Sequence, residues 1–332
     1  ITNSKALYPR VIDPASDAFM LELENRGSVN LASREVSVFP RGAKVRVDKA
    51  ISLLGQCNGN YAHWVTEVLA RFVLIDDLAE YKGWPLLVDH PVHEKLLDAL
   101  DFLNVSRREI INVLPYQKVE AGRLVYVTPP SMTPPDTRTF FETGKLAPPR
   151  VEQFHFSNVA LAKLRERTVP MALDCLISPK LEEPWCELPA PKKQRIFLRR
   201  QAWATGNGRL LRNAEIIEQA LEELQFTGTE IADFSFEGQV LTVQDVEIIV
   251  SPIGAALTNL VFREPGCIVI ILTPHYAEAT FFYFANLMAA LGHELIFVLG
   301  PQTRHGGATV YNRDFRMSVR LLRVAVRKAE IG

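Results

Sequence analysis

The chain has 332 residues, of which 48% are apolar, so it is long enough for two domains that each bury a core. No apolar run reaches the ~18–20 residues that a membrane-spanning helix needs, which argues against an integral membrane protein. The formal net charge of −1 argues against a nucleic-acid-binding protein, because such proteins neutralise phosphates with clustered cations.

The first part of the chain predicts alternating strands and helices. Residues 36–39 and 44–47 are typical of a hairpin, because the proline and glycine between them favour a turn. A long apolar helix is predicted to begin near Asn60. Farther along, the pattern predicts a strand at 85–88, a helix at 92–103, and strands at 110–114 and 124–127. This succession is typical of an open α/β sheet with helices on its faces.

The middle of the chain separates two α/β halves. A helix predicted over 151–168 is flanked by proline-rich stretches, which are typical of linkers. We therefore predict an N-terminal α/β domain at 1–150, a helix and proline-rich linker at 151–194, and a C-terminal α/β domain at 195–332. The elements predicted in the last part are strands at 195–198, 246–250, 268–271 and 294–299, and helices at 213–224, 235–241, 277–291 and 314–329.

Between two predicted buried strands, at 246–250 and 268–271, lies a turn at 251–254. The turn leads into a short helix that is predicted to begin at Ala255. A strand that leads through small residues into a helix presents backbone N–H groups to an anion. Gly254 and Ala255 have so little bulk that a phosphate can approach the main chain closely. The polar pair Thr258 and Asn259 follows one turn into the helix. This segment predicts a phosphorylated ligand, with a nucleotide as the first hypothesis.

The helix near the N-terminus carries four polar residues at spacings of 3, 4 and 4, which place Asn60, His63, Glu67 and Arg71 on one face. One interpretation is a catalytic face, with His63 or Glu67 as general base and Arg71 orienting it or binding an anion. The other is structural: Asn60 caps the helix, Glu67 pairs with Arg71, and the histidine is satisfied at an interface. The spacing leaves both interpretations open.

Arginines are concentrated before the second large helix, within eighteen residues: Arg195, Arg199, Arg200, Arg209 and Arg212. Guanidinium forks suit diphosphate oxygens, although a solvated basic loop has the same composition. Asn213 and Glu215 follow and fit ordinary helix capping. A second basic stripe, made of Arg316, Arg320, Arg323 and Arg327, lies on the last predicted helix. It fits either anionic lipid headgroups or solvent.

Other motifs carry less information. The aromatic run at 281–284 is typical of a core. No CxxC, HExxH, GxGxxG, Walker loop or Asp-x-Asp motif occurs, so we expect no metal and no tightly bound cofactor. The first residues lack the basic and apolar regions of a signal peptide, so we expect a cytoplasmic protein, with the inner face of the membrane as a further location.

Three segments, in order, resemble one family over roughly residues 58 to 275. NYAHWVTEVLARFVLI is similar to the Asn-Tyr-x-His-Trp-x-x-Glu-x-x-x-Arg signature of glycosyltransferase family 61. RIFLRRQ…RLLRNAEIIEQALEEL resembles its arginine-rich strand followed by an Asn-x-Glu helix start. FEGQVLTVQDVEIIVSPIGAALTNLVFREPGCIVIIL resembles its glutamine-containing helix, its strand and its Gly-Ala-x-Leu-Thr-Asn block.

The resemblance implies a GT-B fold, in which two Rossmann-like α/β domains face a cleft, and an inverting mechanism that needs no metal. It implies a nucleotide-sugar donor, with UDP as the first choice, bound by the C-terminal half. The acceptor would be a glycan or a lipid-linked surface polysaccharide, bound by the N-terminal half. Among the family's branches, the resemblance is to bacterial members of the capsular-polysaccharide type.

The resemblance also implies residue roles. Glu67 or His63 is the base, and Asn60 and Arg71 lie on the acceptor side. The donor-binding set is Arg199, Arg200, Arg212, Asn213, Glu215, Gln239, Gly254, Ala255, Thr258 and Asn259. One position departs from the family, since Ile253 stands where a histidine usually precedes the Gly-Ala pair. Two alternatives therefore remain: an inactive sugar-nucleotide-binding homologue, and another two-domain nucleotide-sugar enzyme such as an epimerase.

Overall fold

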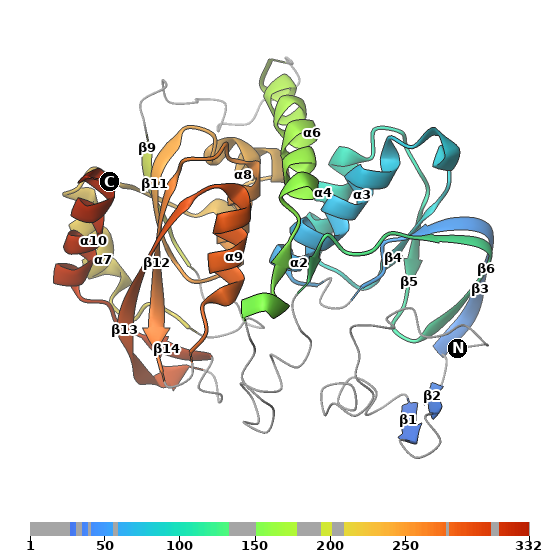
Figure 1. Ribbon diagram of the computed structural model, residues 1–332, viewed down its shortest axis with the longest axis horizontal. Coiled ribbons are helices and arrows are strands. Elements are labelled where there is room, and N and C mark those ends of the chain that lie inside the picture. Colours follow the sequence, from blue (N-terminus) through green and yellow to red (C-terminus); the bar gives the residue numbers. More distant parts are fainter. Residues whose placement is uncertain are drawn as a thin grey trace.

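The computed structural model describes residues 27–30, 35–38, 41–55, 59–132, 151–177, 194–200, 209–276, 279–306 and 312–331. These residues form two larger β-sheets with helices packed on them, and a long helix stands between the sheets (Figure 1). The α/β fold class is therefore confirmed.

The N-terminal sheet has four parallel strands in the order β5-β4-β3-β6. These are β3 (Arg41–Ser52), β4 (Leu86–Asp89), β5 (Ile110–Val113) and β6 (Gln117–Tyr126). Its helical segments are α2 (Tyr61–His63), the π-helix η1 (Trp64–Leu69), α3 (Ala70–Asp76), the 3-10 helix η2 (Ala79–Tyr81) and α4 (Glu94–Leu103). The predicted long helix near Asn60 is thus one continuous segment with a π-helical centre.

The predicted hairpin over 36–47 is wrong. The short strand β2 (Glu35–Val38) pairs antiparallel with β1 (Gly27–Asn30), and β3 instead lies parallel between β4 and β6. The reason is that β3 continues beyond its polar half into the buried residues Ala50, Ile51 and Ser52. Burial of that apolar end in the sheet decides the pairing, and local turn propensity does not.

The C-terminal sheet has six strands in the order β10-β9-β11-β12-β13-β14, and all but β14 are parallel. Its strands are β9 (Gln194–Leu198), β10 (Thr227–Thr229), β11 (Val246–Pro252), β12 (Ile268–His275), β13 (Glu294–Gly306) and β14 (Arg313–Phe315). Its helices are α7 (Ala214–Glu222), η5 (Ile231–Asp233), α8 (Phe236–Thr242), η6 (Ala255–Phe262), α9 (Phe282–Leu291) and α10 (Val319–Ile331). The last helix therefore begins at Val319, later than predicted, because β14 takes the residues before it.

Helices cover both faces of this sheet. Along β9, Ile196 and Leu198 belong to the core that continues toward the N-terminal half, whereas Phe197 between them packs with α7 and α10. The two cores alternate along β9 because successive side chains of a strand point to opposite faces of the sheet. Figure 1 shows α7 and α10 on the outer face and α8 and α9 on the inner one.

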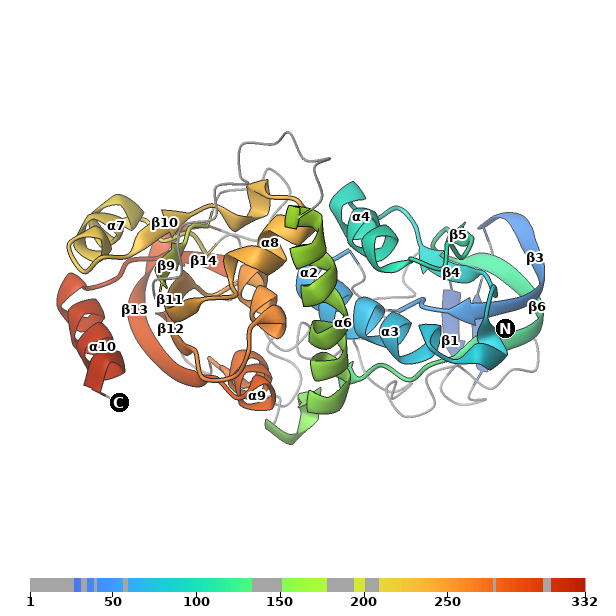
Figure 2. The same cartoon turned by 90° about the horizontal axis from the view of Figure 1, so that it is seen from above.

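The long helix between the sheets is α6 (Asn158–Ile177). A helix was predicted over 151–168, but the observed helix begins later and continues through Pro170. It lies between α3 and α8 when the molecule is seen from above (Figure 2). Its buried residues Leu161, Leu164 and Ala172 lie on both sides of the proline, so tertiary packing overrides the local cost of Pro170.

Of the predicted linker, 178–193 lies outside the described residues. The short strands β7 (Ser131–Met132) and β8 (His155–Phe156) pair beside the helix, and the 3-10 helix η3 (Val151–Gln153) precedes β8.

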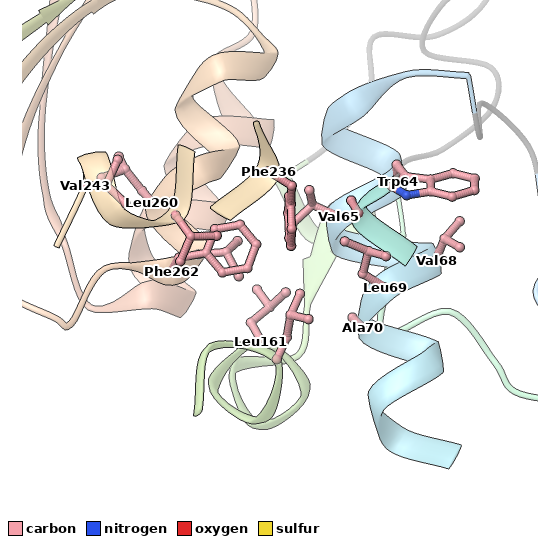
Figure 3. Close-up of a cluster of buried hydrophobic side chains, with 14 of the residues drawn as sticks. Trp64, Val65, Val68, Leu69, Ala70, Leu161, Phe236, Val243, Leu260 and Phe262 are labelled. Atoms are coloured by element: carbon pink, nitrogen blue, oxygen red, sulfur yellow. The ribbon is translucent and has the colours of Figure 1, made fainter. Parts of the chain in front are cut away.

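One hydrophobic core runs through both halves. Val65 and Leu69 of η1 face Phe236 of α8, and Leu161 of α6 lies below them (Figure 3). A polar contact adds to this joint, because Lys95 Nζ in α4 donates to the carbonyl of Ala232 in η5, 2.5 Å away. Among the described helices, none is both long and apolar enough to cross a membrane.

Candidate active site

A cavity of about 170 Å³ lies at the carboxyl ends of β11 and β12. The C-terminal half contributes the turn after β11, the end of β12 and the start of α9, and the N-terminal half contributes the start of α2. Ligands of open α/β sheets bind beyond the carboxyl ends of the strands, so both its position and its two-sided lining favour a binding site.

The strand order places a topological switch point beside this cavity. From β9 the chain adds β10 on one side and then β11, β12 and β13 on the other, so the crevice lies between the ends of β9 and β11. Arg200, which follows β9, spans it: its Nη1 donates to the carbonyl of Ile253, 2.8 Å away.

Gly254 leaves room for the guanidinium of Arg200 in its observed place. A Cβ at residue 254 would lie 2.2 Å from Nη1 of Arg200, closer than any real contact. The segment that follows is the 3-10 helix η6, as Leu257 N donates to the Gly254 carbonyl. The predicted turn and short helix are therefore both present, and Gly254 and Ala255 line the cavity.

The helix of the N-terminal half brings a histidine–carboxylate pair to the same cavity. Nδ1 of His63 lies 2.6 Å from Oε1 of Glu67. The pair is largely enclosed, with side chains 17% and 11% exposed, and His63 lines the cavity. Glu67 lies within η1, and π-helical turns inside α-helices are frequently found at functional sites. The two residues predicted as alternative bases thus form one unit.

The other two polar residues of that face support the helix. Asn60 lines the cavity and also caps the helix, since its Oδ1 accepts from Ala62 N. Arg71 is fully buried and donates from Nε to the Glu67 carbonyl. Its Nη atoms donate to the carbonyls of Leu53 and Leu54, just after β3. Arg71 therefore fixes the helix to the sheet, which holds Glu67 in place.

Several residues predicted to bind the donor lie in other contacts. Arg199 pairs with Glu218 of α7, and Arg212 Nη2 lies 2.6 Å from Oδ2 of the buried Asp314. Asn213 occupies the N-cap position of α7, but its side chain does not cap the helix. It donates to the Met317 carbonyl and accepts from Met317 N, which ties α7 to the start of α10. None of these is among the described residues that line the cavity.

The remaining predicted donor residues are fixed within the C-terminal half. Glu215 is exposed in the first turn of α7. Gln239 in α8 is buried and donates to the Phe234 carbonyl at 3.2 Å. Thr258 is completely buried, and Asn259 accepts a hydrogen bond from Tyr61. Whether any of these contacts a donor stays a prediction.

The structure adds Arg209, which the sequence placed in the arginine cluster without assigning it a role. Its side chain is 9% exposed and lines the cavity, and its φ of 71° is unusual for a residue with a side chain. Strained backbone of this kind is often found at functional sites. Its place in the arginine cluster, just after Gly206 and Gly208 in the sequence, was the sequence signal for it.

Aromatic side chains form a wall of the cavity: Phe154, Tyr276, Phe281, Tyr283 and Phe284. The run at 281–284 was predicted to be core, and this holds for Phe284, which is buried, but Phe281 and Tyr283 also face the cavity. Phe154 is held by α9, because Nδ2 of Asn286 donates to its carbonyl at 2.8 Å. No carboxylate is among the described lining residues, so the cavity suits an anion with apolar or sugar-like parts.

A comparison with known protein families identifies the family of the chain. The family model described as Glycosyltransferase 61 matches residues 61–270, which include the His63–Glu67 pair, Arg209 and the Gly254 turn. The chain belongs to the glycosyltransferase 61 family. No curated protein matches the chain. Family membership supports glycosyltransferase activity, with a sugar donor and an acceptor as substrates.

Membership also confirms the resemblance that the three segments predicted. Two of these segments, around His63 and around Gly254, come from opposite halves and meet at one cavity. Among the residues that the structure describes, no group of three or more His, Cys, Asp or Glu side chains could hold a metal ion.

Proposed function

We propose that the chain is an inverting glycosyltransferase that moves a sugar from a nucleoside-diphosphate donor to a glycan acceptor. UDP is the proposed nucleotide, and a bacterial surface polysaccharide, free or lipid-linked, is the proposed acceptor. One observation carries this proposal: His63, which pairs with Glu67 in one half, and the turn at Gly254, which Arg200 contacts in the other half, line the same cavity.

His63 acts as the base, and Glu67 orients it. A carboxylate that accepts from Nδ1–H holds the imidazole in the tautomer whose Nε2 is free of a proton, as in Ser-His-Asp triads. Because Nδ1 of His63 faces Glu67 at 2.6 Å, Nε2 is the nitrogen left for a substrate. This choice also explains why His63, and not Glu67, is among the lining residues.

The reaction is a single displacement. The acceptor hydroxyl oxygen attacks the anomeric carbon from the face opposite the diphosphate, and the bond from that carbon to the diphosphate oxygen breaks. The configuration inverts, the hydroxyl proton passes to Nε2 of His63, and the nucleoside diphosphate leaves with the bonding electrons. A positioned general base contributes typically ~10²–10⁴-fold to such a rate.

Positive charge stabilises the leaving diphosphate. We assign this to Arg209 and Arg200 together with the backbone N–H groups at Gly254 and Ala255, because these groups are fixed before the reaction begins. Fixed cations and N–H dipoles in an enclosed site act strongly on developing charge and need no metal ion. Arg199 and Arg212 are left out of this group, since each pairs with a carboxylate that offsets its charge.

The cavity volume of about 170 Å³ limits what it encloses. Pockets that bury whole drug-sized ligands have about 300–1,000 Å³. We therefore propose that the cavity encloses the sugar and part of the diphosphate, against the aromatic wall, and that the nucleoside lies outside it along the crevice between β9 and β11.

The test is an activity screen with the purified protein. Nucleotide sugars with different bases and sugars are incubated with and without oligosaccharide acceptors, and release of nucleoside diphosphate and formation of glycan are measured. We expect acceptor-dependent release and a product with inverted anomeric configuration. Conversion of the donor without an acceptor would identify an epimerase-like enzyme instead.

One observation favours an inactive homologue as second candidate. The buried side chain of Ile253 lines the cavity where the family usually has a histidine, so this group can neither donate to a phosphate nor accept from a hydroxyl. In that case the screen would show no turnover, while a thermal-shift measurement would show that a nucleotide stabilises the protein. The intact His63–Glu67 pair leads us to place the active enzyme first.

We also propose that α10 contacts an anionic membrane surface. The outer face of this helix carries, at helical spacing, Arg320, Val324, Arg327 and Ile331. Its exposed apolar side chains are Leu321, Val324 and Ile331, which are 49%, 56% and 88% exposed. Arg323 pairs with Glu223 and is excluded from this surface. Cations beside apolar side chains suit anionic headgroups.

Vesicle flotation tests the membrane proposal. We expect the protein to float with phosphatidylglycerol vesicles and not with phosphatidylcholine vesicles, and the double variant Arg320→Glu, Arg327→Glu to stay in the soluble fraction. Equal behaviour of wild type and variant would remove α10 as the contact.

A further inference from the structure

One hydrogen bond links the helix of the His63–Glu67 pair to the helix that follows the glycine turn. Tyr61 Oη donates to Oδ1 of Asn259 over 2.6 Å, although the two residues lie 198 positions apart in the chain. Tyr61 is the first residue of α2 and stands two positions before His63. Asn259 lies within η6, the 3-10 helix that opens after Gly254. The bond therefore joins the helix that carries the proposed base to the helix that begins at the proposed donor seat.

Both ends of this bond are fixed. Asn259 is 1% exposed, and its Nδ2 donates to the Ala256 carbonyl, so both ends of the amide have a partner. On the other side, the Asn60 cap fixes the first turn of α2. Burial raises the pKa of the Tyr61 phenol, which keeps its hydroxyl protonated and therefore a donor.

We propose that Tyr61 and Asn259 are positioning residues, whose hydrogen bond sets the place of His63 relative to the donor seat at Gly254 and Ala255. This inference rests on the proposed function and changes one of its predicted roles. Asn259 was predicted to bind the donor, but its amide is already engaged on both sides, by Tyr61 and by Ala256.

The reason for such a device lies in the two-sided construction of the site. Base and donor seat belong to different halves, and the core between them packs apolar side chains such as Val65 against Phe236 (Figure 3). Hydrophobic contact is non-directional, so it fixes the rotation of the helix that carries His63 less sharply than a directional contact does. A short hydrogen bond is directional and fixes that rotation. Displacing a reacting group by about 1 Å can cost ~10²-fold in rate.

Tyr61→Phe is the first test, because it removes one oxygen and keeps the ring. We expect kcat for transfer to fall about 10- to 100-fold, while the Kd for the nucleoside diphosphate stays within about twofold, because the donor seat is untouched. Hydrolysis of the donor by water is less dependent on the placement of His63, so the ratio of transfer to hydrolysis should also fall. A purely structural bond would lower the melting temperature and leave this ratio unchanged.

The matched control is Tyr81→Phe in the same half. The Tyr81 ring packs edge-on against Trp84, and Tyr81 is not among the described lining residues, so kcat and the transfer ratio should equal those of the wild type. Full kcat in Tyr61→Phe, or an equal loss in Tyr81→Phe, would overturn the proposal.

A double-mutant cycle tests whether the two residues act together. Asn259→Leu removes the acceptor, and the double variant replaces both partners by apolar groups, which leaves no unpaired hydroxyl or amide oxygen at this contact. We expect the double variant to lose no more kcat than the more impaired single variant. If the loss of kcat in the double variant equals the product of the two single losses, the residues act independently, which would contradict the proposal.

A readout without turnover separates this inference from the proposed function. The His63 ring signals are followed by NMR while UDP is added. If UDP binds nowhere near this cavity, the wild-type signals will not move, and the proposed function fails. If they move equally in wild type and Tyr61→Phe, the function stands and the positioning role of Tyr61 fails. We expect them to move in the wild type and to move far less in Tyr61→Phe.

Discussion

The guanidinium of Arg200 occupies the space that a side chain at Gly254 would need. Nη1 donates to the Ile253 carbonyl at 2.8 Å, and a Cβ on residue 254 would lie 2.2 Å from that nitrogen. The glycine is therefore explained by the arginine, and both stand at the switch point of the sheet.

Gly254→Ala should weaken donor binding with little loss of stability. The new methyl group displaces only the far end of a flexible side chain, so the fold tolerates it, but Arg200 loses its hydrogen bond and its place. Arg200 then also loses its charge-assisted hydrogen bond to the donor diphosphate, which costs about 1.5–3 kcal/mol of binding free energy and corresponds to at least a ~10-fold higher Kd. Isothermal titration with UDP measures this.

Gly59→Ala is the control for that variant, since a Cβ there meets nothing within 4 Å. It should bind UDP like the wild type. Unchanged affinity in Gly254→Ala would show that Arg200 is not part of the donor seat.

Arg209→Gln should raise the Kd for nucleoside diphosphate by about 10-fold or more, because it removes an enclosed cation that lines the cavity. The exposed Arg313 in β14 provides the control, and Arg313→Gln should bind normally. Binding measured at two salt concentrations separates a direct contact from a diffuse field, because diffuse fields are screened by salt. Equal losses in both variants would contradict the assignment of Arg209.

Asp76 should make the protein sensitive to acid. Burial raises the pKa of this carboxyl, but hydrogen bonds from Arg108 and Arg167 lower it by more, so its pKa lies below the usual value. A pKa that is lower in the folded state gives stability that is present above the unfolded-state pKa of ~4 and is lost as the pH falls through the folded-state pKa. Arg167 belongs to α6, so this contact holds the middle helix to the N-terminal half.

Urea unfolding at pH 7 and pH 3 measures the effect. Asp76→Asn should lose about 3–5 kcal/mol at pH 7, because it breaks a buried pair, and should depend less on pH than the wild type. Asp77→Asn is the matched control: its side chain is 55% exposed, so its ion pairs contribute about 0–1 kcal/mol. A similar loss in both variants would rule out a special role for Asp76.

Chelation should not affect transfer. The proposed site stabilises the diphosphate with arginines and backbone N–H groups, so the initial rate with EDTA should equal the rate without it. A rate that depends on added Mg²⁺ or Mn²⁺ would count against the metal-independent mechanism.

The sequence predicted the fold where its signals were local and periodic. Buried strands such as β11 and β12, and the helix that carries His63, follow directly from apolar patterns. The prediction of a hairpin over 36–47 was wrong because the pairing of β3 depends on distant strands: Arg41 pairs with Gln117, 76 residues farther along the chain. The continuation of α6 through Pro170 likewise depends on packing against both halves.

In the candidate site, too, the sequence predicted local features but not long-range contacts. Spacing was enough to place His63 and Glu67 on one helix face, and the small residues at Gly254 and Ala255 were enough to predict the turn. Spacing could not separate Arg209 from the other arginines, because only the tertiary structure shows which of them lines the cavity. The contact between Tyr61 and Asn259 was equally hidden, since nothing local connects the two residues.

The central claim is that His63, oriented by Glu67, removes the proton of the acceptor while the other half holds the donor. The most direct measurement is kcat for sugar transfer by His63→Ala at saturating donor, with the Kd for UDP measured on the same preparation. The account predicts a fall in kcat of ~10²–10⁴-fold with Kd unchanged, and a comparable fall for Glu67→Gln. Full transfer activity in both variants would contradict it.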